Sequence, residues 1–176
     1  TTLRSTTTST LNFGSLSISD LTLQTNSSNS IFSIKNSGTS LILSNVRILV
    51  QTTVSNSFNV SLNASITLNN CFVQDSDTTN FTNSIFSLDL GSSLEIIGGS
   101  YSVNKKFIKS DQANIRINNS SISFSNLANL IFVDLFSDSR LNIVNTRFIN
   151  TAPNSFNSIC FSLDQSSLRA HFDYLV

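Results

Sequence analysis

The amino-acid sequence predicts an all-β fold: a right-handed, single-stranded parallel β-helix of about seven coils, with roughly 25 residues per coil. The first observation is a motif, apolar-x-apolar-x-Asn/Asp-x-x-apolar, that recurs every 21 to 28 residues along the chain. The second is that apolar and polar residues alternate with period two around each copy, as they do in half-buried strands. The third is that no helical periodicity interrupts this pattern. A period of this length is typical of stacked repeats.

Each repeat contains the signals of three short strands. The first strand is the motif itself, as in residues 15–19, Ser-Leu-Ser-Ile-Ser. The second is rich in Phe and β-branched residues, as in 31–34 and 85–90. The apolar residue that ends the motif begins a short third strand. Three strands make one coil that pairs with the coils before and after it, and parallel crossovers favour right-handed winding.

Stacking the repeats places the two apolar residues of the motif in two inward columns. The first column contains Leu16, Leu41, Ile66, Leu94, Ile115, Leu141 and Leu168. The second column contains Ile18, Leu43, Leu68, Ile96, Ile117 and Ile143. These columns are the predicted core.

The polar position of the motif predicts a tight turn with an internal asparagine ladder. Its members are Asp20, Asn45, Asn70, Gly98, Asn119 and Asn145. Asn and Gly both tolerate the left-handed backbone region, and stacked Asn side chains can hydrogen-bond along a column at the strand spacing. We therefore expect these side chains to be buried and aligned. The alternative is a polar stripe that binds a metal ion or a ligand.

Two segments carry a resemblance to a known family: residues 143–150 (Ile-Val-Asn-Thr-Arg-Phe-Ile-Asn) and 68–73 (Leu-Asn-Asn-Cys-Phe-Val). They resemble repeats of the pectin-lyase-like right-handed β-helix superfamily. They are most similar to its surface-protein branch with Asn-(Ser/Thr)-x-Phe-x-x-Asn repeats, as in polymorphic outer-membrane adhesins. The resemblance covers about residues 14–175 and implies a β-helix exposed at a cell surface. We expect residues 1–13 to form an N-terminal lead-in and residues 14–176 to form the β-helix. We also expect both to be part of a longer chain.

Composition limits the partners. The net charge is zero and 11% of residues are charged, which argues against nucleic acid, whose binding needs clustered Lys and Arg. No apolar run approaches 18 residues, so no membrane insertion is expected. Cys71 and Cys160 lie about three repeats apart, on the order of 14 Å, which is too far for a disulfide. No cofactor is expected.

Carboxylates are the first candidates for chemistry. Relatives with this fold that cleave polysaccharides use clustered carboxylates, because one group donates a proton while another activates water. The only pair close in sequence is Asp75 and Asp77, in the longest variable loop, residues 74–83. This pair is either a calcium site or two solvated loop side chains. Such loops often form a binding face, although they also vary freely in unconstrained turns. Enzymatic activity is left open, and its absence is favoured.

The remaining candidates are a basic cluster, a cross-strand charge pair and a lone histidine. Lys105, Lys106 and Lys109 form the one basic cluster, which is either a contact for a small anionic sugar or a solvated edge. Glu95 and Arg116 occupy the same outward position in adjacent coils, so they should pair, for at most about 1 kcal/mol. The single histidine, His171, has no nucleophile near it in sequence, so a catalytic triad is unsupported.

Six sequons occur, which in a chain rich in Asn and Ser either arise by chance or mark N-glycosylation sites if the protein is secreted. The candidate acceptors are Asn26, Asn59, Asn63 and Asn80. Asn119 also begins a sequon, but as a member of the buried ladder it should carry no glycan.

Together these observations predict an extracellular or cell-surface rod or fibre component, structural or adhesive, that displays variable loops from a β-helix spine. The alternatives are a polysaccharide lyase or hydrolase of the same fold, and a segment of a trimeric fibre or spike. The expected partners are further coils of the same chain, end-on or lateral copies of itself, and carbohydrate. An exposed apolar stripe would favour the trimer, but outward positions are mostly Ser, Thr and Asn.

Overall fold

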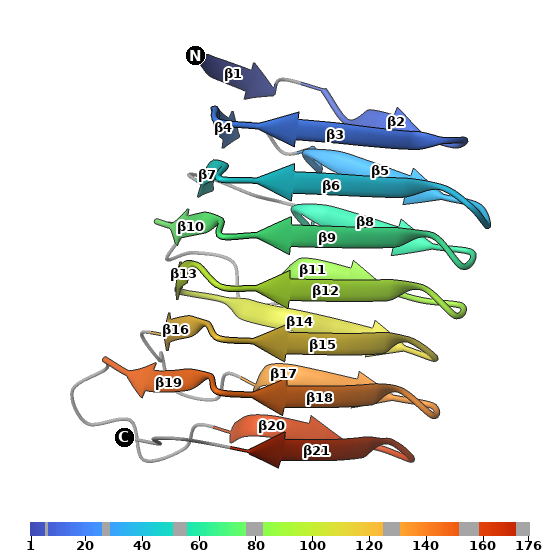
Figure 1. The fold of residues 1–176 in the computed structure, drawn as a ribbon. Coiled ribbons are helices and arrows are strands. Elements are labelled where there is room, and N and C mark those ends of the chain that lie inside the picture. Colours follow the sequence, from blue (N-terminus) through green and yellow to red (C-terminus); the bar gives the residue numbers. More distant parts are fainter. Residues whose placement is uncertain are drawn as a thin grey trace.

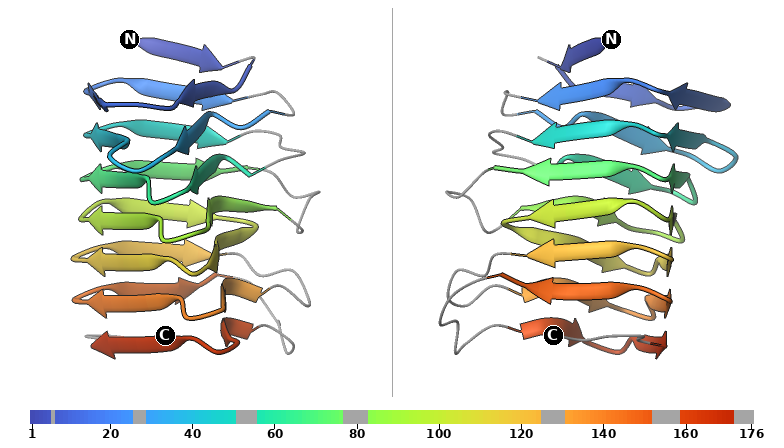
Figure 2. Two further views of the ribbon diagram at one scale, coloured as in Figure 1. Left: turned by 90° about the vertical axis from the view of Figure 1, so that its right-hand side faces the viewer. Right: turned by 60° about the vertical axis from the view of Figure 1, so that its left-hand side comes forward.

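The computed structural model describes residues 1–5, 7–25, 29–50, 56–76, 83–124, 131–151 and 159–171. These residues form 21 strands in three parallel sheets of seven strands each, stacked along one axis (Figure 1). The chain visits the three sheets in the same order in every coil, and the views in Figure 2 show the same stacking from two other sides. The predicted fold class, an all-β parallel β-helix, is confirmed.

The three sheets are named here by their strands. Sheet A contains β1 (Thr2–Ser5), β4 (Thr22–Thr25), β7 (Arg47–Val50), β10 (Phe72–Asp75), β13 (Ser100–Val103), β16 (Ser121–Phe124) and β19 (Arg147–Asn150). Sheet B contains β2 (Ser9–Leu11), β5 (Phe32–Lys35), β8 (Phe58–Ser61), β11 (Ser84–Leu88), β14 (Lys106–Asp111), β17 (Ile131–Phe136) and β20 (Ile159–Leu163). Sheet C contains β3 (Ser15–Ser19), β6 (Ser40–Ser44), β9 (Ser65–Asn69), β12 (Ser93–Ile97), β15 (Asn114–Asn118), β18 (Arg140–Val144) and β21 (Ser167–His171).

Sheet C is built from the strands of the sequence motif, and these strands pair in the predicted register. Leu41 pairs with Ile66, Ile66 with Leu94, and the same column continues to Leu168. The second column runs in the same way from Ile18 to Ile143. From Leu41 and Leu43 to Leu141 and Ile143, the members of both columns are buried. Removing this apolar surface from water is the main force that holds the coils together.

Sheet B contributes an aromatic column to the same core. The rings of Phe58 and Phe86 stack with centroids 5.3 Å apart, and Phe107 and Phe132 stack at 5.5 Å. Phe86 meets Phe107 edge to face, so the column changes geometry between β11 and β14 without a break. Phe-rich second strands therefore supply large buried side chains in successive coils.

The turn between sheets C and A corrects one prediction. Asp20, Asn45, Asn70, Asn119 and Asn145 all have left-handed backbones, with φ between 47° and 55°, and Gly98 has φ 67°. The tight turn is therefore confirmed. The burial of the ladder is wrong, because Asp20 and these four asparagines are exposed and Gly98 is half-buried.

The left-handed residue explains this error. Along a strand, side chains alternate between the two faces, so the motif's polar position should point inward. A left-handed residue interrupts the alternation and turns its own side chain outward. The following position then points inward, and it is buried in Val46, Cys71 and Thr146. Cys71 is accordingly a buried free thiol, and burial raises its pKa.

Candidate functional site

The asparagine ladder exists on the outside of the turn, in part of the column. The Asn45 side-chain amide donates to the carboxylate of Asp20 at 3.2 Å, and the Asn70 side-chain amide donates to the side-chain oxygen Oδ1 of Asn45 at 3.1 Å. Gly98 offers no side chain to continue the row. Beyond this gap, no side-chain hydrogen bond links Asn119 to Asn145, both of which the structure describes. The ladder thus stabilises the first coils and stops at the fourth.

Only one member of the candidate calcium pair, Asp75, lies within the described residues. Asp75 is buried at the end of β10, where it takes the inward position that Val50 occupies in the preceding coil. Its carboxylate accepts a hydrogen bond from the backbone amide of Asn104 at 3.2 Å, and the Asn104 side chain donates to the Asp75 carbonyl oxygen at 2.8 Å. The interpretation of Asp75 as a solvated loop carboxylate is therefore wrong. Asp77 lies outside the described residues.

No group of three or more His, Cys, Asp or Glu side chains that could hold a metal ion occurs in the described part of the chain. The same part contains no helix long and apolar enough to cross a membrane. The backbone of His171 pairs with Val144 at the end of β21, where sheet C has its last described strand.

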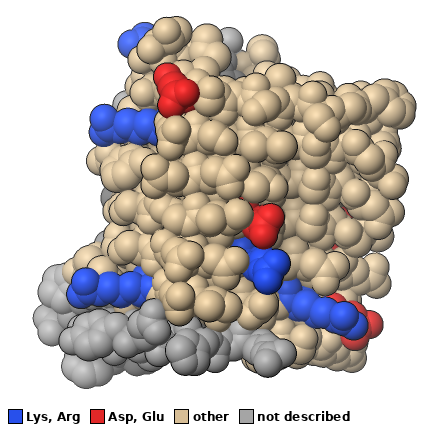
Figure 3. Space-filling view, in the orientation of Figure 1, with Lys and Arg blue, Asp and Glu red and all other residues tan. Residues whose placement is uncertain are grey.

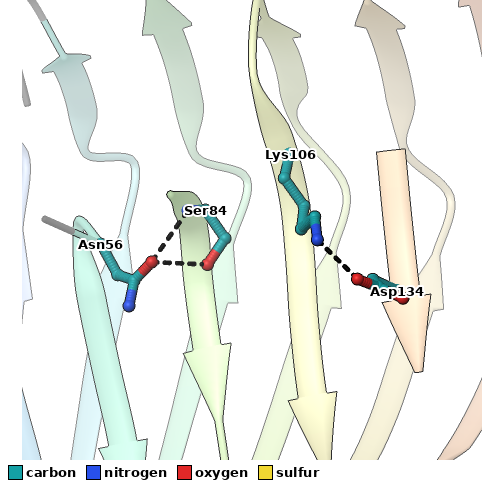
Figure 4. Close-up of polar contacts among 4 residues, drawn as sticks. All are labelled: Asn56, Ser84, Lys106 and Asp134. Carbon is teal, nitrogen blue, oxygen red and sulfur yellow. Dashed lines mark hydrogen bonds and ion pairs between the residues drawn. The ribbon is translucent and has the colours of Figure 1, made fainter. Parts of the chain in front are cut away.

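The basic cluster is divided by the fold. Lys105 is fully buried, Lys106 is nearly buried and Lys109 is exposed. The Lys106 ammonium lies 2.5 Å from a carboxylate oxygen of Asp134 in the next coil (Figure 4). The expectation of a single solvated edge is therefore wrong for two of its three members.

Two of the predicted glycosylation sites are described, and both are engaged in packing. Asn59 is half-buried, and its side-chain amide donates to the hydroxyl of Ser30 at 2.8 Å. The side chain of Asn56 in the same coil bridges Asn59 and Ser84, as Figure 4 shows for Ser84. Asn63 is exposed, but its carboxamide covers Gly91, where an added Cβ would lie 2.2 Å from the Asn63 oxygen. Asn26 and Asn80 lie outside the described residues.

The outer face of sheet C contains a shallow groove of about 460 Å³. It crosses β12, β15, β18 and β21 and exposes hydroxyl, amide and charged side chains. Its polar lining is Ser93, Glu95, Asn114, Arg116, Arg140, Asn142 and Ser167. Charges are sparse on this face and gather over its C-terminal strands, whereas most of the face is uncharged (Figure 3).

Glu95 and Arg116 are paired in register across this groove, as expected, with a carboxylate-to-guanidinium distance of 3.9 Å. Both side chains remain well exposed, so solvent screens the pair and it contributes little stability. Arg140, one coil further on, forms no ion pair with any described residue. The groove therefore offers an exposed guanidinium beside neutral hydrogen-bonding groups.

Sheet B has a pair of carboxylates that the sequence reasoning missed. Leu88 pairs with Ser110, so the adjoining Asp89 and Asp111 follow one another in adjacent coils. Partial burial raises the pKa of Asp89, the charge of Asp111 raises it further, and the charge of Lys35 lowers it. The available signal was their equivalent position at the end of the second strand in consecutive repeats, Asp89 directly after β11 and Asp111 as the last residue of β14.

Comparison with known proteins finds no matching family model, curated protein or solved structure. The sheet topology, a parallel β-solenoid of three sheets, supports the resemblance of the repeats to a β-helix superfamily at the level of the fold alone.

Proposed function

We propose that this chain is the rod of an extracellular surface protein, of the pectin-lyase-like adhesin type, and that it binds carbohydrate along the outer face of sheet C. The groove over β12, β15, β18 and β21 is the observation that carries the proposal. It lies on a spine in which every coil is hydrogen-bonded to its neighbours, so its side chains are held on regular strands rather than on loops.

The chemistry of the groove suits an oligosaccharide. The Asn114, Asn142 and Ser93 side chains can donate to and accept from sugar hydroxyls. Arg140 presents a planar set of donors that can bind a hydroxyl pair or a carboxylate. The groove crosses four strands, about 14 Å at the usual strand spacing, which is enough for a short glycan segment.

A glycan array probed with the purified chain tests this proposal. Binding to at least one oligosaccharide is expected, and Arg140→Gln should weaken it about tenfold or more, the effect of losing about 1.4 kcal/mol. Arg47→Gln is the matched control, because it removes the same charge from β7 in sheet A. Equal losses in both variants, or no binding to any glycan, would refute the groove as the adhesive surface.

A second candidate function, polysaccharide hydrolysis, is favoured by Asp89 and Asp111. Glycoside hydrolysis needs one neutral carboxylic acid and one carboxylate, and the pKa of Asp89 is shifted in the direction that favours its neutral form. Release of reducing ends from neutral and acidic polysaccharides would support this function if Asp89→Asn and Asp111→Asn each abolish it. For the rod, no release is expected.

A further inference from the structure

The gap in the asparagine ladder leaves the Asn119 side chain without a side-chain partner in the preceding coil. Asn119 is exposed, and the equivalent residue in the preceding coil is Gly98, which has no side chain. The Asn119 carboxamide makes no hydrogen bond to another described residue. It borders an open hollow of about 590 Å³ that also touches Ser121 and Arg147. This asparagine therefore has both a free amide and space beside it.

Asn119 also begins the sequence Asn119-Ser120-Ser121, a sequon. The overlapping sequon at Asn118 differs, because its third residue, Ser120, is buried and its hydroxyl donates to the backbone oxygens of Gly98 and Asn118 at 3.1 and 2.9 Å. Ser121 is only half-buried at the start of β16. Of the two overlapping sequons, the one at Asn119 has the accessible acceptor.

The other described sequons lack this combination. The amide of Asn59 is already bound to Ser30, and the carboxamide of Asn63 lies against Gly91. A glycan on Asn59 would attach to the nitrogen that already donates to Ser30, and a glycan on Asn63 would have to fit beside the backbone of Gly91. A glycan is bulky and hydrated, so it requires a surface position such as that of Asn119.

We propose that Asn119 is an N-glycosylation site, contrary to the expectation from sequence that it is buried. The donor is an oligosaccharide linked to a lipid through pyrophosphate. The amide nitrogen of Asn119 forms a bond to the anomeric carbon of the sugar, the bond from that carbon to the lipid pyrophosphate breaks, and the amide loses one proton. The inference rests on the proposed extracellular location, because only a secreted chain meets this donor.

The test is to secrete the full 176-residue chain from a eukaryotic host and to map its glycans. Amide-cleaving glycosidase in ¹⁸O-labelled water converts each occupied Asn to labelled Asp, and peptide mass spectrometry then locates the label. We expect label at Asn119 in the folded, secreted protein and none at Asn59 or Asn63. Label at Asn118 instead, or an unlabelled Asn119, would overturn the proposal.

Matched variants make the assignment specific. Asn119→Gly keeps a residue that accepts the left-handed backbone and should remove one glycan from the intact mass. Ser121→Ala should remove the same glycan while leaving the Asn118 sequon complete, and Ser121→Thr should restore it. If the Ser121→Ala variant keeps the glycan, the proposal is wrong. Binding of unglycosylated, bacterially produced chain to a glycan array is independent of Asn119, so the two proposals fail separately.

Discussion

The Lys106 ammonium and the Asp134 carboxylate bind one another at 2.5 Å between adjacent coils, with only 14% and 7% of their side chains exposed. Lys106 lies in β14 and Asp134 in β17, so this ion pair crosses a junction of sheet B. Water screens such a pair weakly, and each charge depends on the other for compensation.

Removing one partner should therefore destabilise the protein more than removing both. Lys106→Met is expected to lower the free energy of unfolding by on the order of 3 kcal/mol, because it leaves the Asp134 carboxylate buried without a counter-charge. The double variant Lys106→Met/Asp134→Leu should recover most of this loss. Urea denaturation at neutral pH measures both, with Lys35→Met, at an exposed position of β5 that pairs with Ser61, as the control. Equal or additive losses would show that the two groups are not coupled.

The exposed ladder predicts an unusual order of substitutions at Asn45. Asn45→Ala should lower the free energy of unfolding by about 2 kcal/mol. It removes the hydrogen bonds to Asp20 and Asn70, and alanine has no polar side chain to stabilise the left-handed backbone at φ 54°. Asn45→Gly loses the same hydrogen bonds but relieves the backbone, so it should cost less. Thermal unfolding followed by circular dichroism ranks them, and a more stable Ala variant would contradict the role of the left-handed turn.

The two adjacent glycines at the fourth turn should respond very differently to alanine. A Cβ at Gly99 would lie 2.1 Å from the backbone oxygen of Cys71, and the backbone there has φ 94°. Gly99→Ala is therefore expected to cost about 3 kcal/mol or more, since the two coils must separate. At Gly98 the nearest atom would be 3.8 Å away, so Gly98→Ala should cost about 1 kcal/mol of backbone strain. Denaturant midpoints compare the pair; similar losses would mean that close approach of the coils is unimportant.

The carboxylate pair on sheet B predicts a pH dependence of stability. The pKa of Asp89 is raised above its ordinary value of 3.8, chiefly by burial and then by Asp111, so the folded state retains its proton to a higher pH than the unfolded state does. Stability contributed by this group is thus present at acid pH and lost as the pH rises through its folded pKa. Asp89→Asn should flatten this part of the profile and stabilise the protein at pH 7.

Denaturation curves from pH 3.5 to pH 7 measure this effect, with Asp111→Asn as the companion variant. Asp111→Asn should reduce the slope without removing it, because burial of Asp89 is unchanged. A stability that rises with pH in wild type but not in Asp89→Asn would reverse the assigned sign.

The sequence was sufficient for the strands and the inward columns, and the reason is the parallel stacking. Equivalent residues of successive repeats must lie side by side, so a motif that aligns Leu41 with Ile66 in sequence also aligns them in space. The same reasoning failed at Asn45, because it assumed continued alternation across a residue that is left-handed.

Candidate sites were harder to predict, because they arise where a single coil has an unusual residue at a position that the repeat pattern otherwise fixes. Asp75 takes the inward place of Val50, although a composition-based view of loop 74–83 suggested a solvated side chain. Asp89 and Asp111 are 22 residues apart, and only the register of β11 and β14 shows that they are neighbours. Side-chain pairs between adjacent coils are therefore found by aligning the repeats, because their members are far apart in the sequence.

The order of strands within each sheet has a consequence for how such a chain can change over generations. Every strand is hydrogen-bonded only to its equivalents one coil before and one coil after. Duplication or deletion of one complete repeat would therefore join two compatible surfaces and leave all other pairings intact, changing the length of the rod by about 4.8 Å. Loss of part of a repeat would shift the strand register of all later coils. Natural selection should therefore retain gains and losses of whole coils more often than partial ones.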